Sequence, residues 1–330
     1  MDTIADTQVI RAFARHSPQP QAGRVTDFLG IRTRVSTITS IAHLAGTVEP
    51  PPIPANFHAS QLEWAGVLRA ALQTEQRFVA IELGAGWCPW LLAGAVAAQR
   101  CGAQKFSLCG VEACRGHVEF AHQHFQDNPL NGIQLELLHG VAGVQDGFED
   151  FPEIDDPANN WGASAIIAGS NSHQEVLARY RGLRRFSRMA RIGTRRLLRR
   201  LTGGSSVRRL RSYALASLVE RSESIDLLHI NIQGHEFDVV EAALEAVCQR
   251  VKRMVIGTHS EHLSQQLRDL LVHREWSLEA EEACQVHRSR GKESLVIDGC
   301  QVWRNTRLQA QLAASDLAKV DRNAIRRYAA

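Results

Sequence analysis

Short hydrophobic runs alternate with amphipathic or alanine-rich stretches along most of this chain. From residue 60 onward, the spacing of apolar residues predicts helices and strands in turn. The predicted strands are 78–81, 106–111, 133–138, 225–232, 254–256, 277–278 and 295–297. The predicted helices are 60–72, 91–100, 116–126, 236–247 and 263–273. Strands that alternate with helices predict an α/β fold, in which helices cover both faces of a doubly wound, mostly parallel, Rossmann-like sheet.

The two ends of the chain depart from this alternation. The first 55 residues read as irregular and run into three consecutive prolines, which stop any helix. Near the other end, the strand 295–297 turns at Asp298-Gly299 into a further apolar run, which predicts a C-terminal antiparallel hairpin. We therefore expect an N-terminal extension over 1–55, a main domain over 56–305 and a tail over 306–330.

One segment carries the basic charge of the chain. The net charge is +3, but 13 arginines lie between Arg179 and Arg211, and no acidic residue occurs within that stretch. The rest of the chain holds 25 basic and 35 acidic residues. Apolar residues recur at about helical spacing over 181–201 and leave arginines on the remaining face, which predicts a basic amphipathic helix. We expect a basic helical insertion over 176–212, between the third and fourth core strands.

This insertion has three interpretations. Its apolar stripe packs on the domain as a cap, or its arginines contact an anionic membrane surface, or they attract a polyanionic acceptor. Of the external partners, we favour an anionic membrane or glycolipid bound through Arg181–Arg211. Nucleic acid is unlikely by comparison, because aromatic residues in the segment are limited to Tyr180 and Phe186. Nothing in the sequence indicates an oligomeric state.

The sequence shows neither a secretory signal nor an apolar stretch long enough to span a membrane. We therefore expect a cytoplasmic protein that is peripheral to the inner face of the membrane if the insertion binds there. The seven cysteines form no C-x-x-C pair, which argues against a disulfide framework or a zinc site. Histidines at 259 and 262, and at 117, 122 and 124, do not complete a ligand set, so we expect no metal.

A glycine-containing turn, Glu82-Leu83-Gly84-Ala85-Gly86, follows the first predicted core strand. Glycine lets the backbone bend sharply and approach a ligand, and ligands of this fold bind beyond the carboxyl ends of the strands. A dinucleotide site needs a third glycine where this chain has Pro89, which offers no N–H to a pyrophosphate. S-adenosylmethionine carries no phosphate, and a carboxylate at Glu82 suits its amino group. We therefore expect Glu82, Gly84, Ala85 and Gly86 to bind S-adenosylmethionine rather than NAD.

Glu112 ends the next predicted strand, 26 residues after Gly86. A carboxylate at this place accepts hydrogen bonds from the ribose hydroxyls of a nucleoside. The alternative is a solvated glutamate at a strand end. Because both signals occur in the expected order, we add Glu112 to the cofactor-binding set.

Five motifs together resemble the FkbM-type methyltransferases. They are Glu82–Trp87, Gly110–Glu112, His139–Ala142, Asp226–Glu236 and Ile256–Ser260. The resemblance spans roughly residues 56–305 without the arginine segment. It implies a class I methyltransferase fold, S-adenosylmethionine as donor, and O-methylation of sugars, glycans or related natural products. One position departs from the family pattern: Asn231 stands where the family has an aspartate, so the acceptor oxygen is kept and the negative charge is lost.

Residues after the fourth and fifth core strands face the cofactor in this topology. These are Asn231, Gln233 and Glu236 after the fourth strand and His259 after the fifth. A base that removes the acceptor's proton adds about 10² to 10⁴ in rate. His259 is the preferred base because an unperturbed imidazole titrates near neutral pH, and Glu236 is its competitor. Asn231 completes the expected catalytic set, and Asn231 and Gln233 are also expected to contact the cofactor.

The leading hypothesis is an S-adenosylmethionine-dependent methyltransferase that acts on an oxygen of a saccharide, glycan or related small acceptor. A second hypothesis is a non-catalytic module of the same fold, tethered to a membrane or complex by the arginine segment, and Asn231 keeps it open. A third is a nucleotide-dependent oxidoreductase, which Pro89 disfavours.

Overall fold

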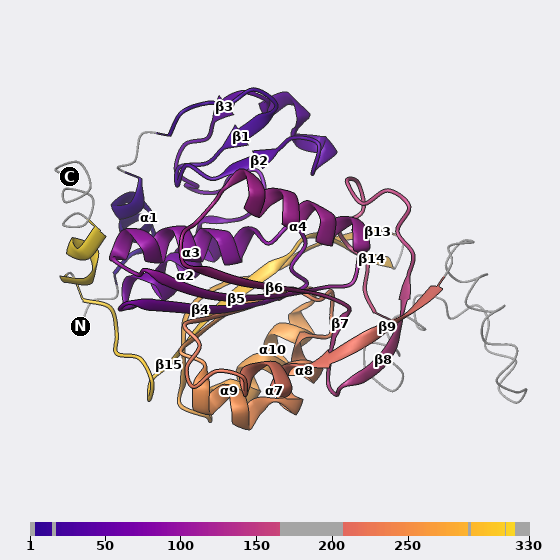
Figure 1. The fold of residues 1–330 in the computed structure, drawn as a ribbon. Coiled ribbons are helices and arrows are strands. Elements are labelled where there is room, and N and C mark those ends of the chain that lie inside the picture. The colour runs from indigo at the N-terminus through magenta and orange to yellow at the C-terminus, as the bar shows by residue number, and fades with distance from the viewer. Residues whose placement is uncertain (1–3, 15–17, 166–206, 290–291, 314, 321–330) are drawn as a thin grey trace, which may run out of the picture.

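The computed structural model describes residues 4–14, 18–165, 207–289, 292–313 and 315–320 (Figure 1). A seven-stranded sheet in the order β12-β15-β11-β10-β4-β5-β6 forms its centre. All neighbours pair in parallel except β15, which is antiparallel to β11 and to β12. The strands are β4 (Arg77–Leu83), β5 (Lys105–Glu112), β6 (Ile133–His139), β10 (Leu227–Ile230), β11 (Arg253–Thr258), β12 (Trp276–Glu282) and β15 (Gly299–Asn305). This order confirms the predicted doubly wound, mostly parallel, Rossmann-like sheet.

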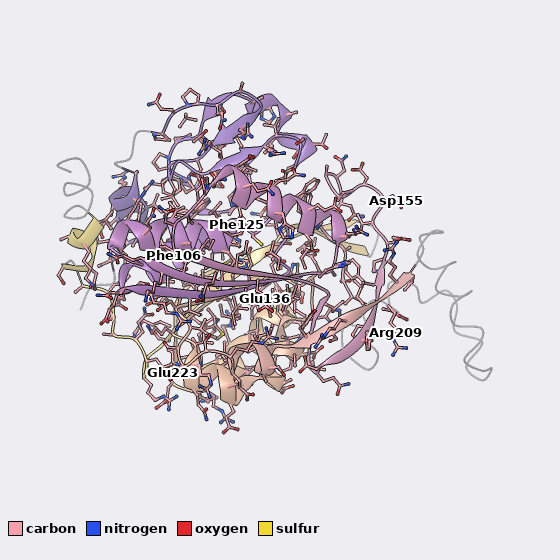
Figure 2. All side chains as sticks on the ribbon, viewed as in Figure 1. Phe106, Phe125, Glu136, Asp155, Arg209 and Glu223 are labelled. Atoms are coloured by element: carbon pink, nitrogen blue, oxygen red, sulfur yellow. The ribbon has the colours of Figure 1, made fainter. Side chains whose placement is uncertain are left out.

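Helices cover both faces of this sheet (Figure 1). One face carries α2 (Gln61–Leu72), α3 (Pro89–Cys101) and α4 (Arg115–Asp127), and the other carries α7 (Leu215–Val219), α8 (Glu236–Ala242), α9 (Leu244–Arg250) and α10 (Glu261–Leu271). Successive strand residues point to opposite faces. On β4, Phe78 therefore joins the hydrophobic core with α2 and α3, whereas Val79 joins the core with α7 to α10. Figure 2 shows Phe106 of β5 and Phe125 of α4 on the same side of the sheet.

The expectation that residues 1–55 are irregular is wrong. The region contains α1 (Asp6–Phe13), η1 (Thr39–Leu44) and a small sheet of β1 (Arg24–Thr26), β2 (Arg32–Arg34) and β3 (Thr47–Val48). Arg24 and Arg34 both donate to the carboxylate of Asp127 and so fix this sheet to the end of α4. Strands of two or three residues are too short to show an alternating pattern, which explains why the sequence does not reveal them.

Two details of the main domain also differ from the expectation. The helix predicted over 236–247 is divided into α8 and α9, because the backbone of Ala243 leaves the helical region at φ −105° and ψ 9°. The predicted strand 295–297 belongs to β14 (Lys292–Ile297), which pairs with β13 (Gln285–Ser289) in a separate hairpin. The antiparallel pair at the edge of the main sheet is instead β12 with β15. The prediction of an antiparallel pair is therefore right, but the strands that form it are different.

A fourth sheet, which the sequence does not predict, begins in the chain directly after β6. It contains β7 (Val141–Gly143), β8 (Gly147–Pro152) and β9 (Val207–Ala214), with β9 between the other two. The predicted basic helix over 181–201 lies outside the described residues. The end of the arginine segment is described in β9, where Arg208 pairs with Glu153 and the Arg209 guanidinium lies 5.4 Å from the centroid of the Phe148 ring. Among the described residues, no helix is both long and apolar enough to cross a membrane.

Candidate active site

The turn after β4 is forced to bend by the strand beside it. Gly84 has a φ of +69°, and a Cβ at this position would lie 1.9 Å from the carbonyl oxygen of Asn231. The same two segments are joined by a hydrogen bond from the Asn231 N–H to the Leu83 carbonyl, at 3.0 Å. The first glycine is therefore required by the close approach of β4 and β10, in addition to any ligand. At Gly86, with a φ of +53°, a Cβ would meet Trp161 at 3.4 Å.

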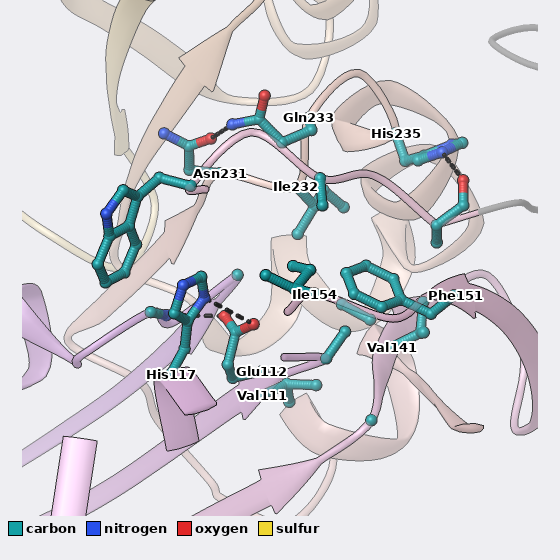
Figure 3. A pocket seen from close by; sticks show the side chains of 18 residues that line it. Val111, Glu112, His117, Val141, Phe151, Ile154, Asn231, Ile232, Gln233 and His235 are labelled. Carbon is teal, nitrogen blue, oxygen red and sulfur yellow. Dashed lines mark hydrogen bonds and ion pairs between the residues drawn. The ribbon is translucent and has the colours of Figure 1, made fainter. Parts of the chain in front are cut away.

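A cleft opens at the carboxyl ends of β4, β5 and β10 (Figure 3). The empty space at this opening is about 610 Å³, part of which is open to the surrounding solvent. One part of the wall is apolar and contains Val141, Phe151, Ile154 and Ile232. The other part is polar and contains Glu112, His117, Asn231 and Gln233. An apolar slot next to a few convergent polar groups is the usual character of a small-molecule site.

Glu112 joins the glycine turn to the end of β5. Its Oε2 accepts a hydrogen bond from the Gly86 N–H at 2.8 Å, and its Oε1 accepts one from the Cys114 N–H at 2.7 Å. Its carboxylate also lies 3.4 Å from Nδ1 of His117. A carboxylate offers about four lone-pair positions. Glu112 therefore retains capacity for a further donor from a ligand while its orientation is fixed by the main chain.

His117 and Trp161 form a stacked pair in the wall of the cleft. Their ring centroids are 4.0 Å apart and their planes differ by 2°. Burial lowers the pKa of His117, but hydrogen bonds to Cys114 and Glu112 and the charge of Glu112 raise it to about 10. His117 is thus the cationic partner of Glu112 at neutral pH. In the sequence, His117 suggests only a metal ligand, and Trp161, which follows β8, carries no signal for a site.

Glu82 lies behind the cleft rather than in its wall. It is 1% exposed, and its Oε2 accepts a hydrogen bond from the Leu91 N–H at 2.9 Å. Burial raises the pKa of this carboxyl well above its usual range. Glu82 thus caps the start of α3, whose first residue is Pro89. The N-terminus of α3 offers little to a pyrophosphate, because Pro89 has no N–H and Glu82 already accepts from the N–H of Leu91. A dinucleotide is therefore disfavoured further. Ala85 is also buried, at 1% exposure, so Gly84 and Gly86 are the turn residues in the wall.

Asn231 and Gln233 follow β10 and line the cleft. The Gln233 Nε2 donates to the Asn231 Oδ1 at 3.1 Å (Figure 3). Gln233 has a φ of +58°, and Gly257 approaches so closely that a Cβ there would lie 3.0 Å from the Asn231 side chain. The two amides are therefore held in fixed positions by neighbouring backbone. The structure brings them together with Glu112, Gly84 and Gly86 in one cleft.

Glu236 and His259 pair with each other outside the lining of the cleft. Glu236 is fully buried, and its oxygens accept hydrogen bonds from the N–H groups of Ile232 at 2.8 Å and Gly234 at 2.9 Å. The Nδ1 of His259 lies 3.2 Å from Glu236, and its Nε2 lies 3.5 Å from Asp298. Burial alone would raise the pKa of the Glu236 carboxyl, but the positive charge of His259 outweighs this effect and leaves the pKa below its usual value. Glu236 is therefore a carboxylate.

This arrangement argues against the general-base role expected for His259 or Glu236. Burial lowers the pKa of His259, but the charges of Glu236 and Asp298 raise it to about 10. An imidazolium at neutral pH has no lone pair to accept a proton. Glu236 instead clamps the loop that carries Gln233, and we do not carry either base assignment forward.

Comparison with known proteins gives one relative of substantial identity. A curated protein of Jannaschia sp. (strain CCS1), which bears the name of a methyltransferase, is 31% identical over 297 residues. The alignment covers 90% of this chain and 97% of that protein. No protein-family model matches the chain.

Solved structures give only distant likenesses. Methyltransferase FkbM from Methylobacillus flagellatus KT has a TM-score of 0.38 and 8% identity, over 70% of this chain and 45% of that one. Precorrin-6y C5,15-methyltransferase from Geobacter metallireducens GS-15 has a TM-score of 0.37 and 9% identity, over 74% of this chain and 88% of that one. The fold of this chain is defined by its own sheet order and strand register.

Proposed function

The chain belongs to the methyltransferases, and we propose that it transfers the methyl group of S-adenosylmethionine to an oxygen of a saccharide, glycan or related small acceptor. The membership follows from the identity to the Jannaschia protein over nearly the full length of both chains. The donor and the acceptor class are the parts that we propose.

One observation carries the proposed donor: the Glu112 carboxylate is fixed to Gly86 at the wall of a cleft that has an apolar part. A nucleoside combines a flat apolar base with two ribose hydroxyls, and a carboxylate with a spare lone pair accepts from one of those hydroxyls. Val141, Phe151 and Ile154 suit the base, and Glu112 suits the ribose. Asn231 and Gln233 suit the amino acid end, since Figure 3 shows them on the opposite side of the cleft from Val141, and Gly84 is a further lining residue.

When bound, S-adenosylmethionine supplies a methyl group on a good leaving group, so the protein's task is to align the acceptor and exclude water. The residues of the wall are suited to this task because each of them is held in place by several contacts. Asn231 is held by Leu83, Gln233 and Gly257, and Glu112 by Gly86 and Cys114. We propose that the amide of Asn231 orients the acceptor hydroxyl.

The proposed acceptor class depends on the resemblance of five motifs to the FkbM-type methyltransferases. That resemblance includes the segment 226–236, which contains both amides of the cleft wall. A transfer assay tests it: S-adenosylmethionine labelled in the methyl group is incubated with monosaccharides, oligosaccharides and small hydroxylated natural products. We expect label in an O-methyl ether of a sugar, whereas label on nitrogen or on protein would contradict the acceptor class.

Calorimetric titration tests the proposed donor. We expect S-adenosylhomocysteine to bind and NAD to give no heat of binding. Glu112→Gln removes the charge but keeps the shape, and we expect it to weaken binding about tenfold, because a hydrogen bond to a charged group contributes about 1–1.5 kcal/mol more than a neutral one. Glu136→Gln is the matched control, since Glu136 lies exposed on β6 and pairs with Arg221. NAD binding, or no binding of either ligand by folded protein, would refute the donor assignment.

A further inference from the structure

An irregular segment after β8, residues 154–165, crosses the cleft from one side to the other. We call it the bridging segment. It contains no strand or helix, and its residues Ile154, Trp161, Ala163 and Ala165 line the cleft. Because no sheet or helix supports the backbone here, the position of the segment depends on contacts with the elements on either side of it.

The first half of the bridging segment is held by α4 and by the N-terminal region. The Nε2 of His117 lies 2.9 Å from the carbonyl oxygen of Pro157, and because a carbonyl only accepts, the imidazole is the donor. A Cβ at Gly116 would lie 2.6 Å from the Pro157 ring, so the proline packs directly on α4. The Thr39 N–H donates to the Ala158 carbonyl at 3.2 Å.

Trp161 brings the segment to the glycine turn. Its indole stacks on His117, and a Cβ at Gly86 would lie 3.4 Å from it. The Trp161 Nε1 donates to the Ala158 carbonyl at 3.2 Å, which ties the indole to its own segment. Trp161 is therefore fixed beside Gly86, whose N–H is bonded to Glu112.

The end of the bridging segment is held by the loop after β10. The Nε2 of His235 lies 3.0 Å from the carbonyl oxygen of Ala165, so this imidazole is also a donor (Figure 3). His235 is 3% exposed and directly precedes α8. A Cβ at Gly162 would lie 3.9 Å from the Gln233 Oε1, so the segment passes within contact distance of the amides of the cleft wall.

Two histidines thus hold the bridging segment from elements on opposite faces of the sheet. His117 lies on α4, which covers one face, and His235 precedes α8, which covers the other (Figure 1). Between them, the segment passes the glycine turn at Trp161 and the amides at Gly162. It therefore lies beside both the residues proposed for the ribose and those proposed for the amino acid end of the donor.

We propose that His235 is a positioning residue, which holds the bridging segment across the cleft and thereby slows the release of bound ligand. The residues proposed to bind the donor lie at the ends of sheet strands, whereas the bridging segment is a wall outside the sheet. Loss of the bond from His235 to Ala165 loosens this wall, so the ligand leaves more readily. This inference rests on the proposed function and adds to it a residue that keeps the ligand in its site.

Release of labelled S-adenosylhomocysteine into an excess of unlabelled ligand tests this inference. His235→Leu keeps the bulk and removes the donor, whereas His235→Gln places an amide N–H near the position of Nε2. We expect the leucine variant to release the ligand about fivefold faster, which is the usual weight of one hydrogen bond. We expect the glutamine variant to restore a rate near that of the wild type.

His273→Leu is the matched control. His273 is exposed in the turn between α10 and β12. This turn lies at the amino ends of the parallel strands, away from the cleft at their carboxyl ends. We expect this variant to release the ligand at the wild-type rate.

Hydrogen exchange of backbone amides measures the segment directly. In ligand-free His235→Leu, we expect faster exchange within the bridging segment, while β4 and β10 exchange as in the wild type. In the wild-type protein, we expect bound S-adenosylhomocysteine to slow exchange over 158–165. The second measurement needs no variant and decides the question if His235→Leu does not fold.

The outcomes separate the inference from the function beneath it. The role of His235 is overturned if folded His235→Leu releases the ligand at the wild-type rate, or if the leucine and glutamine variants release it equally fast. Exchange over 158–165 that is the same with and without bound ligand overturns it as well. A wild-type protein that binds no S-adenosylhomocysteine refutes the proposed donor and the effect on release. Exchange in the ligand-free variant then shows separately whether His235 holds the segment.

Discussion

Gly84→Ala tests the claim that the turn is shaped by the contact between β4 and β10. The added methyl would lie 1.9 Å from the Asn231 carbonyl oxygen, whereas ordinary contacts of this kind exceed 3 Å. No side-chain rotation relieves the overlap, because the obstructing oxygen belongs to the backbone of Asn231. That backbone is held in place by the hydrogen bond from the Asn231 N–H to the Leu83 carbonyl. The substitution must therefore either move β10 or open the turn.

The magnitude follows from two contributions. An alanine in the left-handed region costs about 1–2 kcal/mol, and overpacking of a tight site costs about 1–3 kcal/mol. We therefore expect Gly84→Ala to lower the free energy of unfolding by about 2–5 kcal/mol. Gly86→Ala is the matched control: its φ is also positive, at +53°, but its nearest neighbour is the edge of Trp161 at 3.4 Å. We expect Gly86→Ala to show only the cost of an alanine in the left-handed region, without the cost of overpacking.

Urea unfolding followed by far-ultraviolet circular dichroism measures both variants, with the free energy taken from the midpoint and slope. We expect Gly84→Ala to be less stable than Gly86→Ala by about 1–3 kcal/mol. We also expect weaker binding of S-adenosylhomocysteine by folded Gly84→Ala, since a displaced turn moves the Gly86 N–H away from Glu112. Equal stability of the two variants would show that the contact with Asn231 does not shape the turn.

Two further predictions concern buried ionisable groups. Burial raises the pKa of Asp27 to about 7 from 3.8, so the folded protein holds an extra proton and stability should fall as pH rises from about 4 to about 7. Asp27→Asn should flatten this dependence in urea unfolding measured at several pH values, and an unchanged slope would contradict the assignment. His259→Gln leaves the buried Glu236 without its cation and should cost about 3–5 kcal/mol. Full stability together with lost transfer activity would instead revive the general-base role of His259.

The local pattern of the chain is sufficient for most strands of the main sheet and for the helices that cover it. Phe78 and Val79 are neighbours that pack on opposite faces of the sheet, and an unbroken apolar strand is the sequence signature of that environment. Pro89 at the first position of α3 and Ser260 before α10 mark helix starts, because their preferences are set by backbone groups within one turn. The short strands of the N-terminal region lack such signals. They are held in place by contacts with α4, such as the ion pair of Arg34 with Asp127, which form only in the folded chain.

The sequence by itself thus determined the alternating fold, the glycine-containing turn after β4 and the place of Glu112 at a strand end, because each has a local sequence signal. The contact of Gly84 with the Asn231 carbonyl, which shapes that turn, exists only in the folded chain. The tertiary structure decided which of these side chains face the cleft and what charge they carry. Glu82 turned inward to cap α3, and His259 became a cation between Glu236 and Asp298. Ionisation depends on burial and on charges brought from distant strands, and those distances exist only after the chain has folded.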